Sequence, residues 1–388
     1  QPMRLLRPSK HLLATLSGCA LLSLTCQAQE AWQMGAVLDL RTTSRALSLG
    51  TSESGPSLGH SDVMLSGPVG QDWTAQVILV AHTADGKLET ELENAWVQSQ
   101  RLPLGLQARA GRFASQIGYL NEQHPHADDF VERPLLYRAM FGQHWVDDGV
   151  RLNWTLPTAH YLRLGAEVFS GRQLVKALAP DSGRGAAALN LKTGADVGDS
   201  HSWQFGVSYL YNRREALVEL HDPTEAAHTD VHGAKLSGRH TWMTDLVWKW
   251  APNGNNRREQ WRLVWEQAWQ RDLNRYTPNT QRNLASSVSV VWRFDPAWET
   301  GVRADWLQAH QAALLSPSSA EITRGTLGET AWMLAYKPTH QQTLRLQVAQ
   351  QRASGVNHEG EALFARPASH SIQLQYILGF GAHAAHTY

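Results

Sequence analysis

The sequence predicts an all-β fold, a transmembrane antiparallel β-barrel of about 16 strands. Three observations predict it: apolar and polar residues alternate along most of the chain, short and long connections take turns, and tryptophans gather at strand ends. Alternation with a period of two places one face of each strand against apolar material. The chain offers no run of about 18 apolar residues for a membrane helix. If the chain crosses a membrane, it therefore does so with strands.

Residues 1–28 are predicted to be a signal peptide. A basic start is followed by the apolar stretch 12–25 and by small residues before the expected cleavage after Ala28. The alternative is lipoprotein processing at Cys19, which follows the letters "LSG". Cleavage after Ala28 would remove both cysteines of the chain, Cys19 and Cys26, which suits an oxidising compartment outside the inner membrane.

Residues 29–388 are predicted to form the barrel, because the alternation recurs throughout this region. In residues 201–212, aromatic and aliphatic side chains share one face, and Gln204, Ser208 and Asn212 share the other. The predicted strands lie near residues 31–41, 60–67, 72–82, 88–99, 104–113, 147–156, 160–170, 186–195, 201–212, 239–250, 259–271, 285–295, 297–307, 329–337, 342–351 and 369–381.

The connections differ in length on the two sides of the predicted barrel. Those after even-numbered strands are short, such as "GPVG" and "FDPA", and most of those after odd-numbered strands are long, such as 114–146 and 308–328. Short periplasmic turns and long extracellular loops are typical of transmembrane barrels. A soluble sandwich would need a second sheet over the apolar face. Membrane lipid is the simplest way to cover the apolar face of the strands.

The 16 tryptophans favour the membrane interpretation over a large soluble core, because many stand at strand ends. Aromatic residues at both ends of the strands would form the two girdles found at membrane interfaces. On the short-turn side they are Trp73, Trp154, Trp203, Trp250, Trp261, Phe294 and Trp298, and on the long-loop side Trp242, Trp269, Trp306 and Trp332.

The polar face of the strands would line an aqueous lumen. The formal net charge is zero, so no nucleic-acid partner is indicated. On the face predicted to line the lumen, nine basic residues stand against nine acidic ones, Glu93 among them, so strong ion selectivity is not indicated either. The side chains predicted to line the pore are Arg109, Arg151, Arg163, Glu167, Arg262, Glu266, Arg303 and Asp305.

The stretch "NEQHPHADDF", residues 121–130, lies in the long connection 114–146, the third on its side of the barrel. Imidazoles at His124 and His126 could face one ion across Pro125, with nearby carboxylates as oxygen ligands, so bound zinc is possible and no other cofactor is expected. Two histidines do not complete a tetrahedral site. An ordinary polar pore loop and a surface loop are the alternatives. The polar candidates are Glu122, His124, His126, Asp128 and Asp129. A second histidine pair, His383 and His386, stands near the C-terminus.

Catalytic motifs are scarce. The sequence has no "GxSxG", no "HExxH", no P-loop and no dinucleotide fingerprint. A barrel enzyme of the lipase or protease type could use His144, Asp147 and Asp148, but these residues are better explained as a turn that starts a strand. We therefore expect no enzymatic activity.

The chain resembles bacterial outer-membrane porins and porin-like channels. The resemblance rests on the signal peptide, on the alternating strands across 30–388, and on the last strand "SIQLQYILGF" with its aromatic residues. The segment from "ENAWVQSQRLPL" to "ERPLLYRAMFG" is similar to plug-less porin-like proteins found with zinc-responsive outer-membrane receptors. Alternation that begins at Trp32 leaves no plug domain, so energised uptake is not expected.

The resemblance implies a function and a location. The expected function is passive diffusion of small hydrophilic solutes or ions across the outer membrane of a Gram-negative bacterium. The third long loop would fold into the barrel and narrow the pore. Expected partners are outer-membrane lipid, the barrel-assembly machinery, which would read the last strand, and two further copies in a homo-trimer. A zinc uptake channel and a barrel enzyme are the alternatives.

Overall fold

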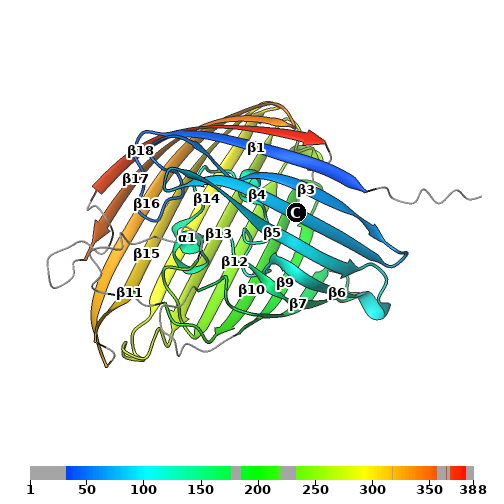
Figure 1. Cartoon of the computed structure of the whole chain (residues 1–388). Coiled ribbons are helices and arrows are strands. Elements are labelled where there is room, and N and C mark those ends of the chain that lie inside the picture. The colour runs from blue at the N-terminus through cyan, green and yellow to red at the C-terminus, as the bar shows by residue number, and fades with distance from the viewer. Residues whose placement is uncertain are drawn as a thin grey trace, which may run out of the picture. The chain divides into compact units, whose positions relative to one another are not determined.

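The computed structural model describes residues 32–175, 185–216, 218–219, 233–316, 318–355, 364 and 368–381. In this part of the chain, 18 strands form one sheet, and 16 of them build a closed antiparallel barrel (Figure 1). The barrel closes because the first strand pairs with the last, from Gly35 opposite Gly381 to Thr43 opposite Gln373. The predicted fold class is confirmed. The predicted signal peptide and the pair His383 and His386 lie outside the described residues.

The wall strands follow the chain around the barrel, each paired with its neighbours in sequence. They are β1 (Gln33–Thr43), β3 (Ser61–Val69), β4 (Trp73–Ala84), β5 (Lys87–Ser99), β6 (Leu106–Ala114), β7 (Val146–Thr155), β8 (Tyr161–Phe169), β9 (Ala186–Val197), β10 (His201–Asn212), β12 (His240–Trp250), β13 (Gln260–Arg271), β14 (Asn283–Asp295), β15 (Trp298–Ser316), β16 (Ser319–Thr339), β17 (Gln342–Ser354) and β18 (Ala368–Gly381).

The connections hold the remaining short elements. Strand β2 (Gly55–Leu58) pairs with β1, and β11 (Val218–Glu219) pairs in parallel with β15. The helical elements are α1 (Leu135–Met140) and the 3₁₀ turns η1 (Pro103–Gly105), η2 (Pro125–Ala127) and η3 (Pro252–Gly254). Among the described residues, no helix has both the length and the apolar character needed to span a membrane.

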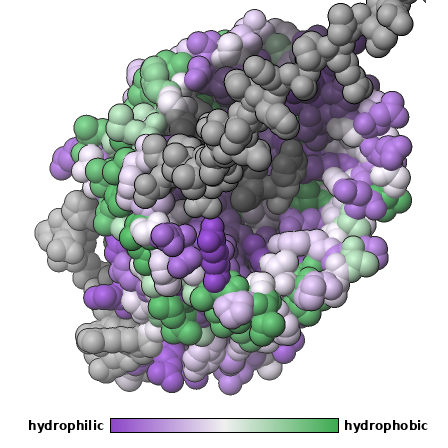
Figure 2. All heavy atoms as spheres, turned by 90° about the vertical axis from the view of Figure 1, so that its right-hand side faces the viewer, coloured by the Kyte–Doolittle hydropathy of each residue, from purple (hydrophilic) through white to green (hydrophobic). Residues whose placement is uncertain are grey.

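The two faces of the wall differ as the alternation predicts. In β15, Val302 and Trp306 are 54% and 41% exposed on the outside, whereas Arg303 and Asp305 between them are buried inside. In Figure 2, hydrophobic residues gather along parts of the outer edge of the molecule, and hydrophilic residues gather toward the middle. The outer face thus suits lipid, and the inner face holds the charges.

One predicted loop is wrong. Residues 308–328 were expected to form a long loop, but β15 and β16 continue through this region as a long β-hairpin. The reason is that the ladder between them is unbroken from Trp298 opposite Tyr336 to Leu314 opposite Ala320. As a result, Trp306 and Trp332 lie within strands rather than at their ends.

Residues 115–145 connect β6 to β7 and are called loop L3 below. The helix α1 lies in this loop and contacts β14 and β15. Its Leu135 and Leu136 are fully buried, in one cluster with Met243 of β12, Ala285 of β14 and Leu307 of β15. The main hydrophobic core therefore lies inside the barrel, between L3 and the wall, and it holds the loop in the lumen.

Candidate functional site

Loop L3 contacts arginines of the wall on one side of the lumen. Asp129 accepts a hydrogen bond from Arg262 of β13, with 3.1 Å between Nε and Oδ2. Arg345 of β17 donates to the main-chain oxygen of residue 128 at 2.6 Å, and Arg303 of β15 donates to the main-chain oxygen of residue 132. We call the contacts of Arg262, Arg303 and Arg345 with L3 the arginine side.

Helix α1 adds a buried ion pair to this side. The guanidinium of Arg138 lies 2.5 Å from a carboxylate oxygen of Glu329 in β16, and Arg303 binds the other oxygen of the same carboxylate at 2.5 Å. These side chains are at most 2% exposed. Glu132 accepts from the backbone of Thr51 and Ser52, at 3.0 and 2.8 Å, which ties L3 to the first long loop.

A second set of charges lies near β7 and β8. Glu122 of L3 faces Arg151 and Arg163 at 3.4 and 3.3 Å. Burial opposes ionisation of Glu122, but the two arginines lower its pKa to about 2, so the carboxylate is charged at neutral pH. Glu167 lies 2.7 Å from Arg151 and accepts from the Ser115 hydroxyl.

The remaining predicted pore residues also lie on the inner face. Glu266 accepts from the Tyr137 hydroxyl at 2.5 Å and from the Tyr119 backbone at 2.8 Å, so it binds L3 directly. Asp305 pairs with its strand neighbour Arg303 at 2.8 Å. Arg109 donates to Gln98. The functional roles assigned to these side chains stay predictions.

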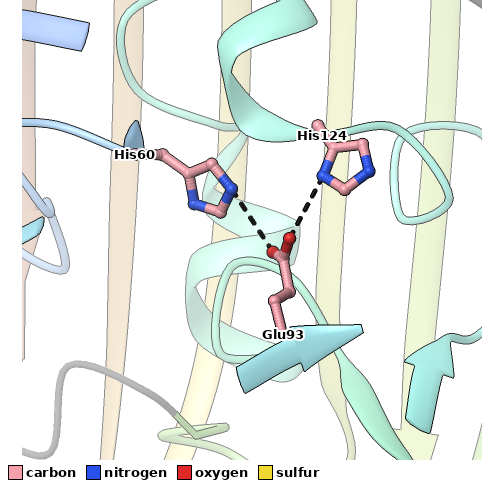
Figure 3. Close-up of side chains that lie close together, drawn as sticks. All are labelled: His60, Glu93 and His124. Carbon is pink, nitrogen blue, oxygen red and sulfur yellow. Dashed lines mark ion pairs between the residues drawn. The ribbon is translucent and has the colours of Figure 1, made fainter. Parts of the chain in front are cut away.

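The opposite side of L3 has a different chemistry. Nδ1 of His124 lies 3.1 Å from one oxygen of Glu93, and Nε2 of His60 lies 3.4 Å from the other (Figure 3). His144 contacts Glu93 as well, at 2.8 Å from Nδ1, and Nδ1 of His126 lies 3.0 Å from Asp62. We call His60, Asp62, Glu93, His124, His126 and His144 the histidine cluster.

Local backbone features position these side chains. His124 is the N-cap of η2, and Pro125 sets the turn so that the rings of His124 and His126 stack with centroids 5.6 Å apart. Glu93 stands at a β-bulge, since the register of β4 and β5 shifts between Ile78 and Leu79. A β-bulge adds one residue to a strand, so two neighbouring side chains can point to the same face. It leaves both Glu93 and its neighbour Asn94 buried.

Burial shapes the charge state of the imidazoles. It lowers the pKa of His144 to about 4 despite the neighbouring Glu93 carboxylate, and it lowers the pKa of His126. For His60 burial acts in the same direction, but the carboxylates of Glu93 and Asp62 outweigh it and raise the pKa. Neutral imidazole is therefore favoured at two of the four positions, and neutral imidazole is the form that binds metals.

Sequence reasoning found part of this cluster. It identified His124 and His126 as a candidate pair that needs further ligands, and it placed Glu93 on the inner wall, but it assigned no role to His60 or Asp62. Sequence spacing carries no signal for either, because the strands β4, β5 and β6 separate them from L3 in the chain. His144 was considered as a catalytic residue beside Asp147 and Asp148, but its partner is Glu93. Asp148 pairs with Arg112 instead.

The comparisons with known proteins agree with the fold. No protein-family model matches the chain. An uncharacterized protein of Aquifex aeolicus is 28% identical over 356 residues, which cover 86% of this chain and 70% of that protein. The name of this relative states no activity, so the class of the fold comes from solved structures.

Three solved structures show that class. The outer-membrane channel DcaP of Acinetobacter baumannii matches with a TM-score of 0.55 and 10% identity, covering 91% of this chain and 98% of that one. The trimer form of OmpT from Vibrio cholerae matches with a TM-score of 0.54 and 11% identity, covering 90% of this chain and 99% of that one. The anion-selective porin of Comamonas acidovorans matches with a TM-score of 0.54 and 9% identity, covering 90% of this chain and 100% of that one. The chain has the fold of outer-membrane porins.

Proposed function

We propose that this protein is an outer-membrane channel for the passive diffusion of small hydrophilic solutes or ions, and that it has no enzymatic activity. Loop L3 narrows the lumen in this proposal. Lipid covers the apolar outer face, and the long loops point to the cell exterior. The porin fold supports the proposal, since similar barrels include an outer-membrane channel and an anion-selective porin.

The position of L3 carries the proposal. The loop contacts wall residues of β5, β8, β13, β15, β16 and β17 through charged and polar groups. A charged loop held inside a 16-strand barrel restricts the path that solutes take. The pore-lining residues are those predicted above, and Glu122, His124, His126, Asp128 and Asp129 belong to the constriction.

Planar-bilayer recording of the refolded full-length chain tests this function. The expected result is stepwise conductance that changes when Glu122→Gln removes the charge facing Arg151 and Arg163. Glu259→Gln, at a short turn, is the matched control and should leave conductance unchanged. The absence of conductance steps together with hydrolysis of phospholipid or peptide would overturn the channel and favour a barrel enzyme.

The finer assignments rest on resemblance. We propose that the chain belongs with the porin-like barrels found with zinc-responsive receptors, that it assembles as a homo-trimer, and that its last strand is recognised by the barrel-assembly machinery. The trimer form of OmpT supports a trimeric state. Mass measurement by light scattering in detergent tests it, and a monomeric mass in native-like lipid would exclude it.

A further inference from the structure

We propose that the histidine cluster binds one divalent transition-metal ion of the zinc class, with His60, Glu93 and His124 as its ligands. The bound ion then clamps L3 to the wall at β5 and at the start of β3. Asp62, His126 and His144 surround these ligands and complete or orient the coordination. The metal site stands on its own geometry and does not require that the barrel conducts.

The distances suit a single ion. Ligand atoms of His60, Glu93 and His124 all lie within 4.8 Å of one another, and those of His60, Asp62 and His126 do so as well. Nitrogen and oxygen ligands at about 2.0–2.2 Å from a tetrahedral zinc ion stand roughly 3.3 Å apart. The observed separations of 3.1 and 3.4 Å between the imidazole nitrogens and the Glu93 oxygens match that spacing.

The candidate ligand atoms contact one another within the cluster. Nε2 of His60, Nδ1 of His124, Nδ1 of His126 and one oxygen of Glu93 are buried, and apart from these ion-pair contacts they have no hydrogen-bond partner among the described residues. Buried polar atoms without a partner cost free energy. A metal ion at the centre of the group would give several of these atoms a partner at once.

The charges of the cluster also favour a bound cation. Among the described residues, the ion pairs of Glu93 and Asp62 are with histidines rather than with arginine or lysine. Other buried acids of the lumen, such as Glu299 and Glu329, pair with arginine or lysine. A divalent cation would balance the two carboxylates, as arginine does elsewhere in the lumen.

The donor set and the space decide the class of ion. Imidazole nitrogens combined with carboxylate oxygens suit zinc, cobalt and nickel, whereas calcium and magnesium prefer oxygen ligands alone. A cavity of about 110 Å³ borders the cluster and is lined by His60, Glu93 and His144. It leaves room for a water molecule as the fourth ligand.

Metal binding to the refolded, chelator-treated full-length chain tests the site. Cobalt(II) alone is followed by visible absorption and zinc alone by calorimetry. We expect one ion per chain with the intense absorption of a tetrahedral site. The substitutions Glu93→Gln, His60→Ala and His124→Ala should each lower affinity by at least about 100-fold, above the effect typical of an outer-shell partner.

The matched controls are His340→Ala and Glu259→Gln, which lie at short turns and should retain full affinity. Barrel folding of each variant is checked by its heat-modifiable migration in gels. Wild-type binding no stronger than that of a Glu93→Gln variant that has folded would overturn the proposal. Equal affinities for zinc and magnesium would overturn the assigned class of ion.

Hydrogen–deuterium exchange tests the clamp. Zinc should protect the backbone of residues 121–127 relative to the chelator-treated protein, whereas residues 128–133, held by arginines, should change little. Bound zinc without added protection at 121–127 would refute the clamp. Neither measurement depends on conductance, so failure of the metal site and failure of the channel can be told apart.

Discussion

The two sides of loop L3 are attached by different chemistry. On the arginine side, Arg262 and Arg345 bind a carboxylate and a main-chain oxygen of the loop. In the histidine cluster, His124 and His126 face Glu93 and Asp62. Guanidinium groups keep their charge at any physiological pH, whereas imidazole changes charge and binds metals. One attachment is therefore permanent, and the other depends on conditions.

This difference indicates how loop L3 can be both fixed and adjustable. The hydrophobic contacts of α1 and the arginine side hold the second half of L3 against β13–β17. The first half, which carries His124 and His126, contacts β5 and the start of β3 through groups that a metal ion would bridge. An ion at the cluster would fix the first half of the loop without loosening its core.

The largest effect is expected from breaking the buried ion pair of the arginine side. Arg138→Met keeps much of the side-chain volume but removes one of the two charged partners of Glu329; Arg303 remains. Breaking a buried pair typically costs about 3–5 kcal/mol, and we expect the lower end because one arginine remains. The free energy of unfolding in urea measures the loss.

The control for this variant is Arg258→Ala, whose side chain is exposed at a short turn. A loss for Arg138→Met that does not exceed the control would mean that the pair contributes nothing to stability. Deuterium exchange of α1 should rise in parallel, because the helix depends on this pair for its only charged contact with β16 among the described residues.

A smaller effect is expected for the pair of Arg262 and Asp129, both of which are 19% exposed. A double-mutant cycle with alanine at each position should give a coupling free energy of about 1–2 kcal/mol, because solvent weakens a charge-assisted hydrogen bond. The same cycle on Arg275 and Glu215, an outer ion pair with a more exposed arginine, should give less. Similar couplings in the two cycles would remove the distinction between lumen and surface.

The smallest effect is a lack of response to mild acid. Burial opposes ionisation of Glu132, but Arg138 and Arg41, together with the Thr51 and Ser52 donors, lower its pKa below the ordinary value of 4.5. A carboxyl with a lowered folded pKa stabilises the fold above its unfolded pKa and loses that contribution as the pH falls through the folded value. The protection of residues 128–133, which is their exchange rate divided by the intrinsic amide rate at each pH, should therefore be unchanged between about pH 5 and 8.

A loss of protection at residues 128–133 between neutral pH and pH 5 would contradict this expectation, and Glu132→Gln would identify the source. The glutamine side chain cannot ionise, so the protection of these residues in the variant should be independent of pH throughout the same range. A pH response that persists in Glu132→Gln would come from another group, and the permanence assigned to the arginine side would be wrong.

The sequence by itself determined the barrel. Alternation is a local property of a strand, because every second side chain must face lipid, and it survives in the order of residues. For the same reason the strand at 201–212 and its inward-facing Gln204 and Ser208 could be predicted without coordinates. The connection lengths placed the longest loop correctly in the chain order. The extension of β15 and β16 was missed because its residues are too polar to be read as membrane strands.

Only the tertiary structure decided what L3 contacts. The pair His124 and His126 was visible as a motif, but the route of the loop brings it to His60 and Glu93, which are distant in sequence. The bulge at Glu93 leaves both Glu93 and Asn94 buried, which the strict alternation behind the strand prediction does not indicate. The order of residues predicts which face of the barrel wall a strand residue occupies. It does not predict which wall residues the side chains of a long loop contact, because that depends on how the core packs around α1.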